Sequence, residues 1–184
     1  MSTPRHINPA CPSRIRIHRQ RGRMMVPLII LLLVIATGGL FWMLTAWSHE
    51  QHECEQNLKK IYTALETYEA KNHMLPKLAY FPDDPNDADS LRTVLEGDLP
   101  DLKACICPGL HPVLREMGMT YIWNMRLNGK PLPQHDEQQQ WMLVEMTAIS
   151  REVPSPHIGG YNVLFTDGSV KHIANPTPET LPGL

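Results

Sequence analysis

Three cysteines and one histidine–aspartate pair are the residues of this chain whose types could support chemistry. The cysteines are Cys54, Cys105 and Cys107, and a fourth, Cys11, stands near the N-terminus. Nine residues separate His157 from Asp167, and such side chains serve as general acids and bases in enzymes. No nucleophile or second carboxylate stands at a spacing that would complete a catalytic set. We therefore expect no enzyme activity and assign no catalytic residue.

What the cysteines can do depends on their side of a membrane. Residues 24–47 form an apolar block without charge, long enough at about 1.5 Å per residue to span a hydrocarbon core of about 30 Å. Six arginines and no acidic residue precede it, within residues 1–23. The positive-inside rule then predicts a cytoplasmic tail (1–23), a helix across the inner (cytoplasmic) membrane (24–47) and a periplasmic or other extracytoplasmic domain (48–184).

A cleaved signal peptide is the alternative interpretation of the apolar block. Signal peptides have apolar cores of about 7–15 residues followed by a small-x-small cleavage site. The block here is longer, and the residues after it (LTAWSHEQ) offer a poor site. Both interpretations export the acidic body of the chain.

Disulfides persist outside the cytoplasm, and three exported cysteines allow at most one bridge among them. We favour Cys54–Cys107, which would join a long helix to the loop before the sheet, with Cys54–Cys105 as the alternative. A metal site on Cys105-x-Cys107 is disfavoured because this spacing is tighter than that of zinc knuckles. We therefore expect no resident metal.

Two charged segments have a ligand-binding and a solvated interpretation. Residues 83–89 (DDPNDAD) carry the carboxylate and amide oxygens that calcium prefers, but lack the glycine and terminal glutamate of an EF-hand loop. A solvated loop is preferred, so we expect no cofactor and keep calcium as the alternative. The arginine-rich tail adjoins a membrane span, so its expected partner is membrane lipid rather than nucleic acid.

The body that follows the span begins with a helical pattern. Apolar residues recur at spacings of 4, 3, 4 and 3, which places them on one helix face. They are Cys54, Leu58, Ile61, Leu65 and Tyr68. The pattern predicts a helix over 49–75 that continues directly from the membrane span and is ended by Pro76.

Short elements are expected to complete the domain. Ser90 is the expected N-cap of a helix over 91–96. Strands are expected at 120–127, before an Asn128-Gly129 turn, and at 141–148, a candidate central strand. Residues 161–173 predict a hairpin whose two-residue type I′ turn, Asp167-Gly168, pairs Thr166 with Ser169. The C-terminal stretch NPTPETLPGL shows no packing pattern. The predicted fold class is α+β: a long N-terminal transmembrane helix continuing into a soluble helix packed on a small antiparallel sheet.

Four stretches of the body resemble a known family. They are the helix CEQNLKKIYTALETYEAKNHMLP (54–76), Cys107-Pro108, Tyr121-Ile-Trp-Asn124, and His157-IGGYNVLFT-Asp167-Gly168. In this order they resemble the bacterial pilin-like proteins with a C-terminal H-x9-DG motif, relatives of type II secretion pseudopilins. The resemblance implies a pilin-like fold, assigns His157, Asp167 and Gly168 to the motif, and implies pseudopilins or secretion-platform proteins as partners.

The N-terminus departs from that family. Its members open with a prepilin peptidase site, in which a glycine precedes the cut and Phe-Thr-Leu-Ile-Glu follows it. Here the corresponding stretch is Gly22-Arg23-Met24-Met25-Val26-Pro27, with proline where the glutamate should stand. We therefore expect a membrane-anchored, pseudopilin-like structural or interaction protein, associated with a type II secretion or type IV pilus-like system. The alternative is a free-standing anchored sensor or ligand-binding domain that has lost filament assembly.

Overall fold

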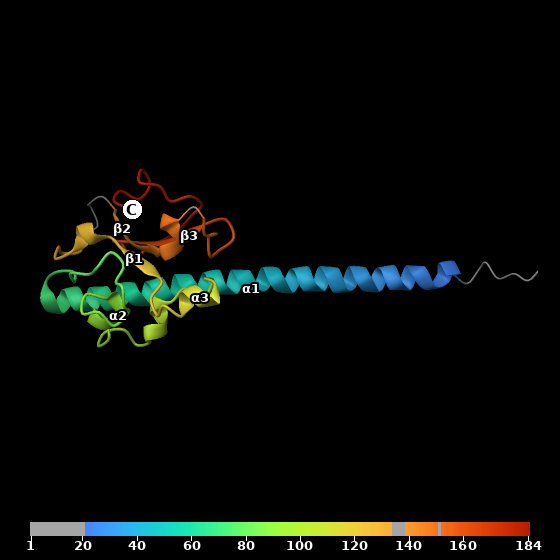
Figure 1. Ribbon diagram of the computed structural model, residues 1–184, viewed down its shortest axis with the longest axis horizontal. Helices are drawn as coiled ribbons and strands as arrows, with labels where there is room; N and C mark the ends of the chain where they lie inside the picture. The colour runs from blue at the N-terminus through green and yellow to red at the C-terminus, as the bar shows by residue number, and fades with distance from the viewer. Residues whose placement is uncertain (1–20, 134–138, 151) are drawn as a thin grey trace, which may run out of the picture. The chain divides into compact units, whose positions relative to one another are not determined.

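The structure is a computed structural model that describes residues 21–133, 139–150 and 152–184 (Figure 1). The chain divides into two compact units, Met1–Met43 and Leu44–Leu184, and one helix, α1 (Arg21–Asn72), contributes residues to both. Most of the predicted cytoplasmic tail, Cys11 included, lies outside the described residues.

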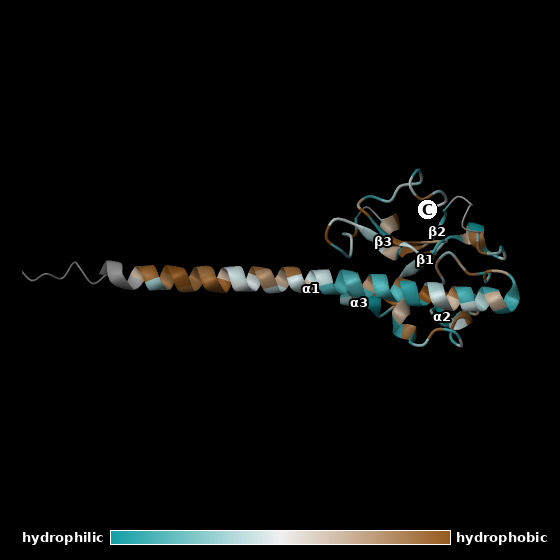
Figure 2. Ribbon diagram, turned by 180° about the vertical axis from the view of Figure 1, so that it is seen from behind, coloured by the Kyte–Doolittle hydropathy of each residue, from teal (hydrophilic) through white to brown (hydrophobic). Residues whose placement is uncertain are grey.

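The part of α1 in the first unit is apolar, and its side chains are exposed. Its large side chains from Met25 to Phe41 are all more than half exposed, and Figure 2 shows this stretch as the hydrophobic part of the helix. Among the described residues it is the one helix long and apolar enough to cross a membrane. Its Thr37 hydroxyl donates to the Leu33 carbonyl, 2.8 Å away, so the helix itself satisfies this polar group. A single-pass membrane protein is the class that such a helix defines.

The part of α1 in the second unit supplies one wall of a core. Cys54, Leu58, Ile61 and Leu65 are all fully buried, which confirms the predicted stripe. The helix ends at Asn72 rather than at the predicted Leu75, because the next residue, His73, adopts a left-handed backbone with φ of 61°.

Four antiparallel strands form the sheet, in the order β1-β2-β3-β4. They are β1 (Tyr121–Trp123), β2 (Trp141–Glu145), β3 (Tyr161–Phe165) and β4 (Val170–Ile173). Every residue of β2 and β3 is buried, which confirms the central position expected for the strand at 141–148. The α+β class is therefore confirmed: a long N-terminal helix followed by a small antiparallel sheet.

Short helices connect these elements. They are α2 (Leu91–Val94), α3 (Pro112–Arg115) and the 3₁₀ helices Leu102–Cys105, Met125–Leu127 and Met146–Ile149. Ser90 caps α2 by accepting from the Arg92 N–H, as expected. The predicted strand over 120–127 was too long, because the Asn124 side chain accepts from the Arg126 N–H and starts a 3₁₀ helix there.

The predicted turn at Asn128-Gly129 is present, with Gly129 at a positive φ of 67°, but it follows the 3₁₀ helix Met125–Leu127 rather than a strand. The Asn128 side chain also joins this turn to two other segments: it accepts from the indole of Trp123 at 2.7 Å and from the Leu78 N–H, and it donates to the Leu78 carbonyl.

The β3–β4 hairpin has a register one residue away from the prediction. Thr166 was expected to face Ser169, but Leu164 faces Val170 and Asn162 faces His172. The cause is the loop: only Gly168 has a positive φ, at 77°, so the connection contains three residues rather than a two-residue type I′ turn. A shift of one residue moves side chains to the opposite face of the strand. His172 therefore lies beside Asn162, with Nδ1 3.3 Å from the amide oxygen.

The C-terminal stretch covers the face of the sheet opposite the helix. Leu181 is fully buried against Trp141, Val163 and their neighbours in a second apolar cluster. The Trp141 indole donates to the Pro182 carbonyl at 3.0 Å. The absence of a packing pattern in this proline-rich stretch was therefore misleading, because two leucines, Leu181 and Leu184, and one carbonyl make the contact.

Candidate functional site

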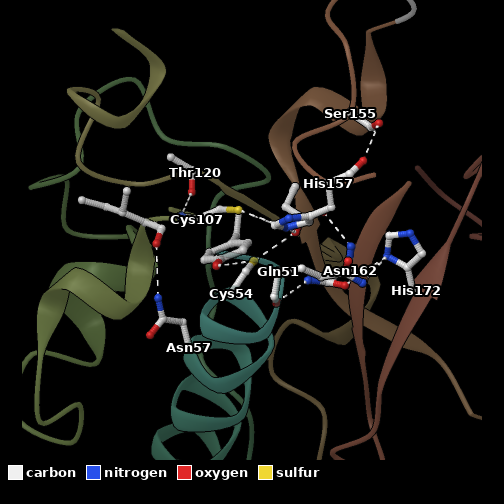
Figure 3. A network of polar contacts seen from close by, with 12 residues as sticks. Gln51, Cys54, Asn57, Cys107, Thr120, Ser155, His157, Asn162 and His172 are labelled. Carbon is white, nitrogen blue, oxygen red and sulfur yellow. Dashed lines mark hydrogen bonds and ion pairs between the residues drawn. The ribbon is translucent and has the colours of Figure 1, made fainter. Parts of the chain in front are cut away.

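Four side chains with chemical potential meet inside the second unit. Cys54 lies on α1, Cys107 on the loop after the 3₁₀ helix at 102–105, and His157 on the loop before β3 (Figure 3), and Glu145 lies at the end of β2. The first three are fully buried and His157 is 5% exposed. Among the described residues, these four form the one group of three or more His, Cys, Asp and Glu side chains close enough to share a metal ion.

One carboxylate oxygen is the centre of this buried cluster. Glu145 Oε1 lies 2.9 Å from His157 Nε2 and accepts from Cys54 Sγ at 3.0 Å. Cys107 Sγ is 3.8 Å from the same oxygen and 3.4 Å from His157 Nε2. The two sulfurs, the carboxylate oxygen and the imidazole nitrogen all lie within 4.8 Å of one another, so they face a common point.

Backbone contacts hold the two loop residues in place. The Cys107 N–H donates to the Thr120 hydroxyl at 2.7 Å, which ties its loop to the start of β1. The His157 carbonyl accepts from the Ser155 hydroxyl at 3.0 Å. The His157 ring packs on Gly109, where a Cβ would come within 2.8 Å of the imidazole. Only glycine lets the ring lie this close to the backbone.

The surroundings also fix Glu145 and Cys54. The other oxygen of Glu145, Oε2, accepts from the Asn162 N–H at 2.7 Å, so β3 orients the carboxylate. The Tyr121 hydroxyl lies 3.2 Å from Cys54 Sγ. Burial raises the pKa of Tyr121 well above its usual value, so the phenol is neutral.

Charge within the cluster is balanced by one ion pair. Burial acts to lower the pKa of His157, but interactions with Cys54 and the Glu145 carboxylate raise that pKa to about 9. Burial, with Cys107 and Glu145 nearby, raises the pKa of the Cys54 thiol. At neutral pH His157 is therefore an imidazolium beside Glu145, and Cys54 is a neutral thiol.

The arrangement does not match a cysteine protease-type triad. In such triads the carboxylate binds one imidazole nitrogen and the nucleophile faces the other. Here Cys107 and Glu145 both face Nε2, while Nδ1 is buried without a hydrogen-bond partner among the described residues. The cluster is also buried from solvent, so a substrate has no access to either thiol. Its geometry suits a bridge or a bound ion better than catalysis.

The predicted motif residues separate into two places. His157 is in the buried cluster, whereas Asp167 lies in the β3–β4 loop, where it accepts from the Ser169 N–H at 2.9 Å and from the Gln139 amide. Gly168 beside it lies against the ring of Tyr62, which a Cβ would approach to 2.6 Å. The structure thus does not bring His157 and Asp167 together as an acid–base pair.

The two cysteines of the favoured disulfide do meet. Cys54 and Cys107 are free thiols here with their sulfurs in one cluster, so a bridge between them stays a prediction. Cys105, the alternative partner, is buried outside the cluster, and burial raises its pKa to about 12.

Sequence reasoning missed Glu145 and Tyr121. A signal for Glu145 was present, because an acidic residue inside an apolar, centrally placed strand (WMLVEMTA) needs a buried partner. Tyr121 was named only as part of the Tyr121-Ile-Trp-Asn124 stretch, and a tyrosine in a strand gives no sign of its contact with Cys54.

The acidic loop over 83–89 forms hydrogen bonds within itself. Asp84 Oδ1 accepts from the backbone and side-chain amides of Asn86, and Asp87 Oδ2 accepts from the Asp84 N–H at 3.0 Å. The carboxylates of Asp84 and Asp87 therefore stabilise turns of the loop, which is what the interpretation as a solvated loop expects. Calcium binding there stays untested.

Comparison of the chain with protein-family models, with curated proteins and with solved structures gave no match. The class of the protein therefore follows from its fold: an α+β domain whose first helix also carries a candidate membrane span.

Proposed function

We propose that this chain is a pilin-like protein anchored in the inner membrane, which acts through protein–protein contacts as a component of a type II secretion or type IV pilus-like apparatus. Its partners in this proposal are pseudopilins or secretion-platform proteins. The protein performs no catalysis.

The observation that carries the proposal is that α1 contains both the candidate membrane span and the main helix of the sheet domain. In one unbroken helix of 52 residues, the first part has exposed apolar side chains and the later part forms the wall of a sheet-based core. This is the layout of a pilin subunit, and it supports the resemblance found in the Cys54–Pro76 helix and the H-x9-DG stretch.

The topology of the proposal rests on charge. Six arginines precede the span and the acidic body follows it, so residues 1–23 are cytoplasmic and the sheet domain is periplasmic. Protease added to spheroplasts should remove the body and leave a membrane-protected fragment that contains the N-terminal tail. Protection of the body would contradict this orientation.

The N-terminus favours an anchored component over a fibre subunit. Pro27 stands where pilins carry the glutamate that meets a neighbouring subunit. Mass spectrometry of the purified protein decides this point: an intact N-terminus means a fixed anchor, whereas a chain that begins at Arg23 means prepilin-type processing.

Copurification tests the apparatus itself. Cross-linking in intact cells, followed by isolation of the chain, should recover pseudopilins or platform proteins, and deletion of the platform should change its level or complex size. A monomer unaffected by that deletion would overturn the apparatus link and favour the free-standing sensor.

A further inference from the structure

We propose that Cys54, Cys107, Glu145 and His157 form a closed structural site for a tetrahedral divalent metal ion, with zinc as its natural occupant. The inference depends on the buried cluster alone and not on the proposed secretion role.

The donor set selects the kind of metal. Two thiolates, one imidazole and one carboxylate match the sulfur, nitrogen and oxygen ligands of zinc. Calcium and magnesium prefer oxygen ligands throughout, and iron–sulfur clusters use cysteines almost alone. Four protein ligands leave no open position, and the four side chains are buried, so the site is structural rather than catalytic.

Two of the six distances between ligand atoms lie in the range of a tetrahedron around one ion, two are slightly shorter, and the remaining pairs lie within 4.8 Å. Bonds of about 2.0–2.3 Å imply separations of about 3.3–3.8 Å between neighbouring ligand atoms. The Cys107 Sγ–His157 Nε2 distance is 3.4 Å, and Cys107 Sγ lies 3.8 Å from Glu145 Oε1. The two shorter contacts of Oε1, 2.9 Å to His157 and 3.0 Å to Cys54, need to open by only a few tenths of an ångström.

Contacts around the ligands support binding. Metal-ligating carboxylates are usually held by a second group, and the Asn162 N–H holds Glu145 Oε2 while Oε1 faces the cluster. The Tyr121 hydroxyl lies beside Cys54 Sγ, where it can donate to a thiolate. The Cys107 backbone is fixed by Thr120, so the loop ligand is already in position.

The charge of the bound site is compatible with the assignment. Zinc binds cysteines as thiolates and histidine as neutral imidazole, so its binding releases the protons that these groups carry and leaves two thiolates, one carboxylate and a neutral imidazole around the ion. The bound site carries one negative charge. A Cys54–Cys107 disulfide would instead use only the two sulfurs, and the convergence of Glu145 Oε1 and His157 Nε2 on them would have no role.

The ion would cross-link distant parts of the domain. Its ligands come from α1, the loop before β1, the end of β2 and the loop before β3. Such a clamp would hold the helix on the sheet without an oxidising environment.

The test measures zinc in the full-length protein, purified in detergent with a thiol reductant. Elemental analysis should give about one zinc per chain for the wild type. Cys105→Ser is the matched control, because Cys105 is equally buried but outside the cluster, and it should retain the metal. Cys107→Ser and His157→Gln should bind zinc at least about tenfold more weakly in competition with a chelator. All variants also carry Cys11→Ser, so that the thiol of the N-terminal tail cannot contribute to the zinc measured.

A cobalt experiment on the wild type keeps the proposal testable if the ligand variants do not fold. After chelation, added Co²⁺ should produce the intense visible bands of tetrahedral cobalt and a near-ultraviolet thiolate charge-transfer band. A folded protein that gives only a weak octahedral spectrum overturns the proposal. Zinc binding that is unchanged in Cys107→Ser also overturns it. So does a native protein that contains no metal, whose mass is lower by two hydrogens and whose peptide map shows a Cys54–Cys107 disulfide. None of these outcomes bears on copurification with a secretion platform.

Discussion

Glu145 places a carboxylate where the strand around it is apolar. Its whole side chain is buried, and its two oxygens are used by His157, Cys54 and the Asn162 backbone. Burying a charge is tolerated only when it is paired and hydrogen-bonded, and both conditions hold here. This residue therefore links the stability of the domain to the state of the cluster.

Replacing Glu145 by glutamine should strongly destabilise the metal-free protein. The change leaves the imidazolium of His157 without its counter-charge, and breaking a buried pair in this way costs about 3–5 kcal/mol. Chemical denaturation in reductant and chelator measures the loss. Glu96→Gln, at an exposed position, is the control and should change stability by less than about 0.5 kcal/mol. Removing Glu145 and His157 together should cost less than the two single losses combined; simple additivity would contradict their pairing.

Gly168 should tolerate no side chain. A Cβ there meets the Tyr62 ring at 2.6 Å, and its φ of 77° lies in the left-handed region. Both effects act together, so Gly168→Ala should lower the free energy of unfolding by about 2 kcal/mol or more. Gly97→Ala, where nothing lies within 4 Å of the added Cβ, is the control and should be close to neutral. Equal midpoints for both variants in urea would contradict this account of the motif glycine.

At the scale of elements, the β3–β4 hairpin depends on the charge of Asp167. Partial burial acts to raise the pKa of Asp167, but hydrogen bonds with Ser169 and Gln139 and the nearby Lys171 outweigh it and lower the pKa below its usual value. A pKa depressed in the folded state adds stability above the unfolded pKa, and that stability is lost as pH falls through the folded value.

The wild type should therefore lose more stability than Asp167→Asn when the pH falls from 7 to 3. Urea midpoints at several pH values measure the difference. The effect should be small, because Asp167 is largely solvated. Parallel pH profiles for the two proteins would show that the loop hydrogen bonds do not depend on the carboxylate charge.

Leu181 should be the residue that attaches the C-terminal stretch to the sheet. It is fully buried in the second apolar cluster, so Leu181→Ala should cost about 2–5 kcal/mol. Glu179→Ala, exposed on the same stretch, is the control. Thermal unfolding of the two variants measures the difference, and similar melting temperatures would indicate that the stretch contributes nothing to the core.

The elements show how far the sequence predicts this fold. The stripe from Cys54 to Leu65 and the buried strand at 141–145 follow from periodicity and apolarity, which are local properties. The hairpin register does not, because Asp-Gly fits a two-residue and a three-residue loop, and packing on Tyr62 is a tertiary contact. The sequence predicts part of the cluster. Its residue types single out the cysteines and His157, but the contact with Glu145 follows only from the tertiary structure, in which β2 ends beside α1.

At the scale of the whole molecule, the membrane span and the sheet domain share one helix. The sequence predicted the span from charge segregation and apolar length, and the described helix agrees with it. Orientation and partners are properties of the assembled system, so the spheroplast and copurification experiments address them directly.

The wide separation of the cluster residues along the chain also makes the cluster a reporter of opening. More than half of the chain's length separates Cys54 from His157, and contacts between residues so distant in sequence form slowly. Both cluster thiols are fully buried, so a thiol reagent reaches them only when the domain opens. The labelling rate of Cys54 and Cys107 in intact cells would therefore measure how often the sheet domain unfolds while the protein is anchored in the membrane.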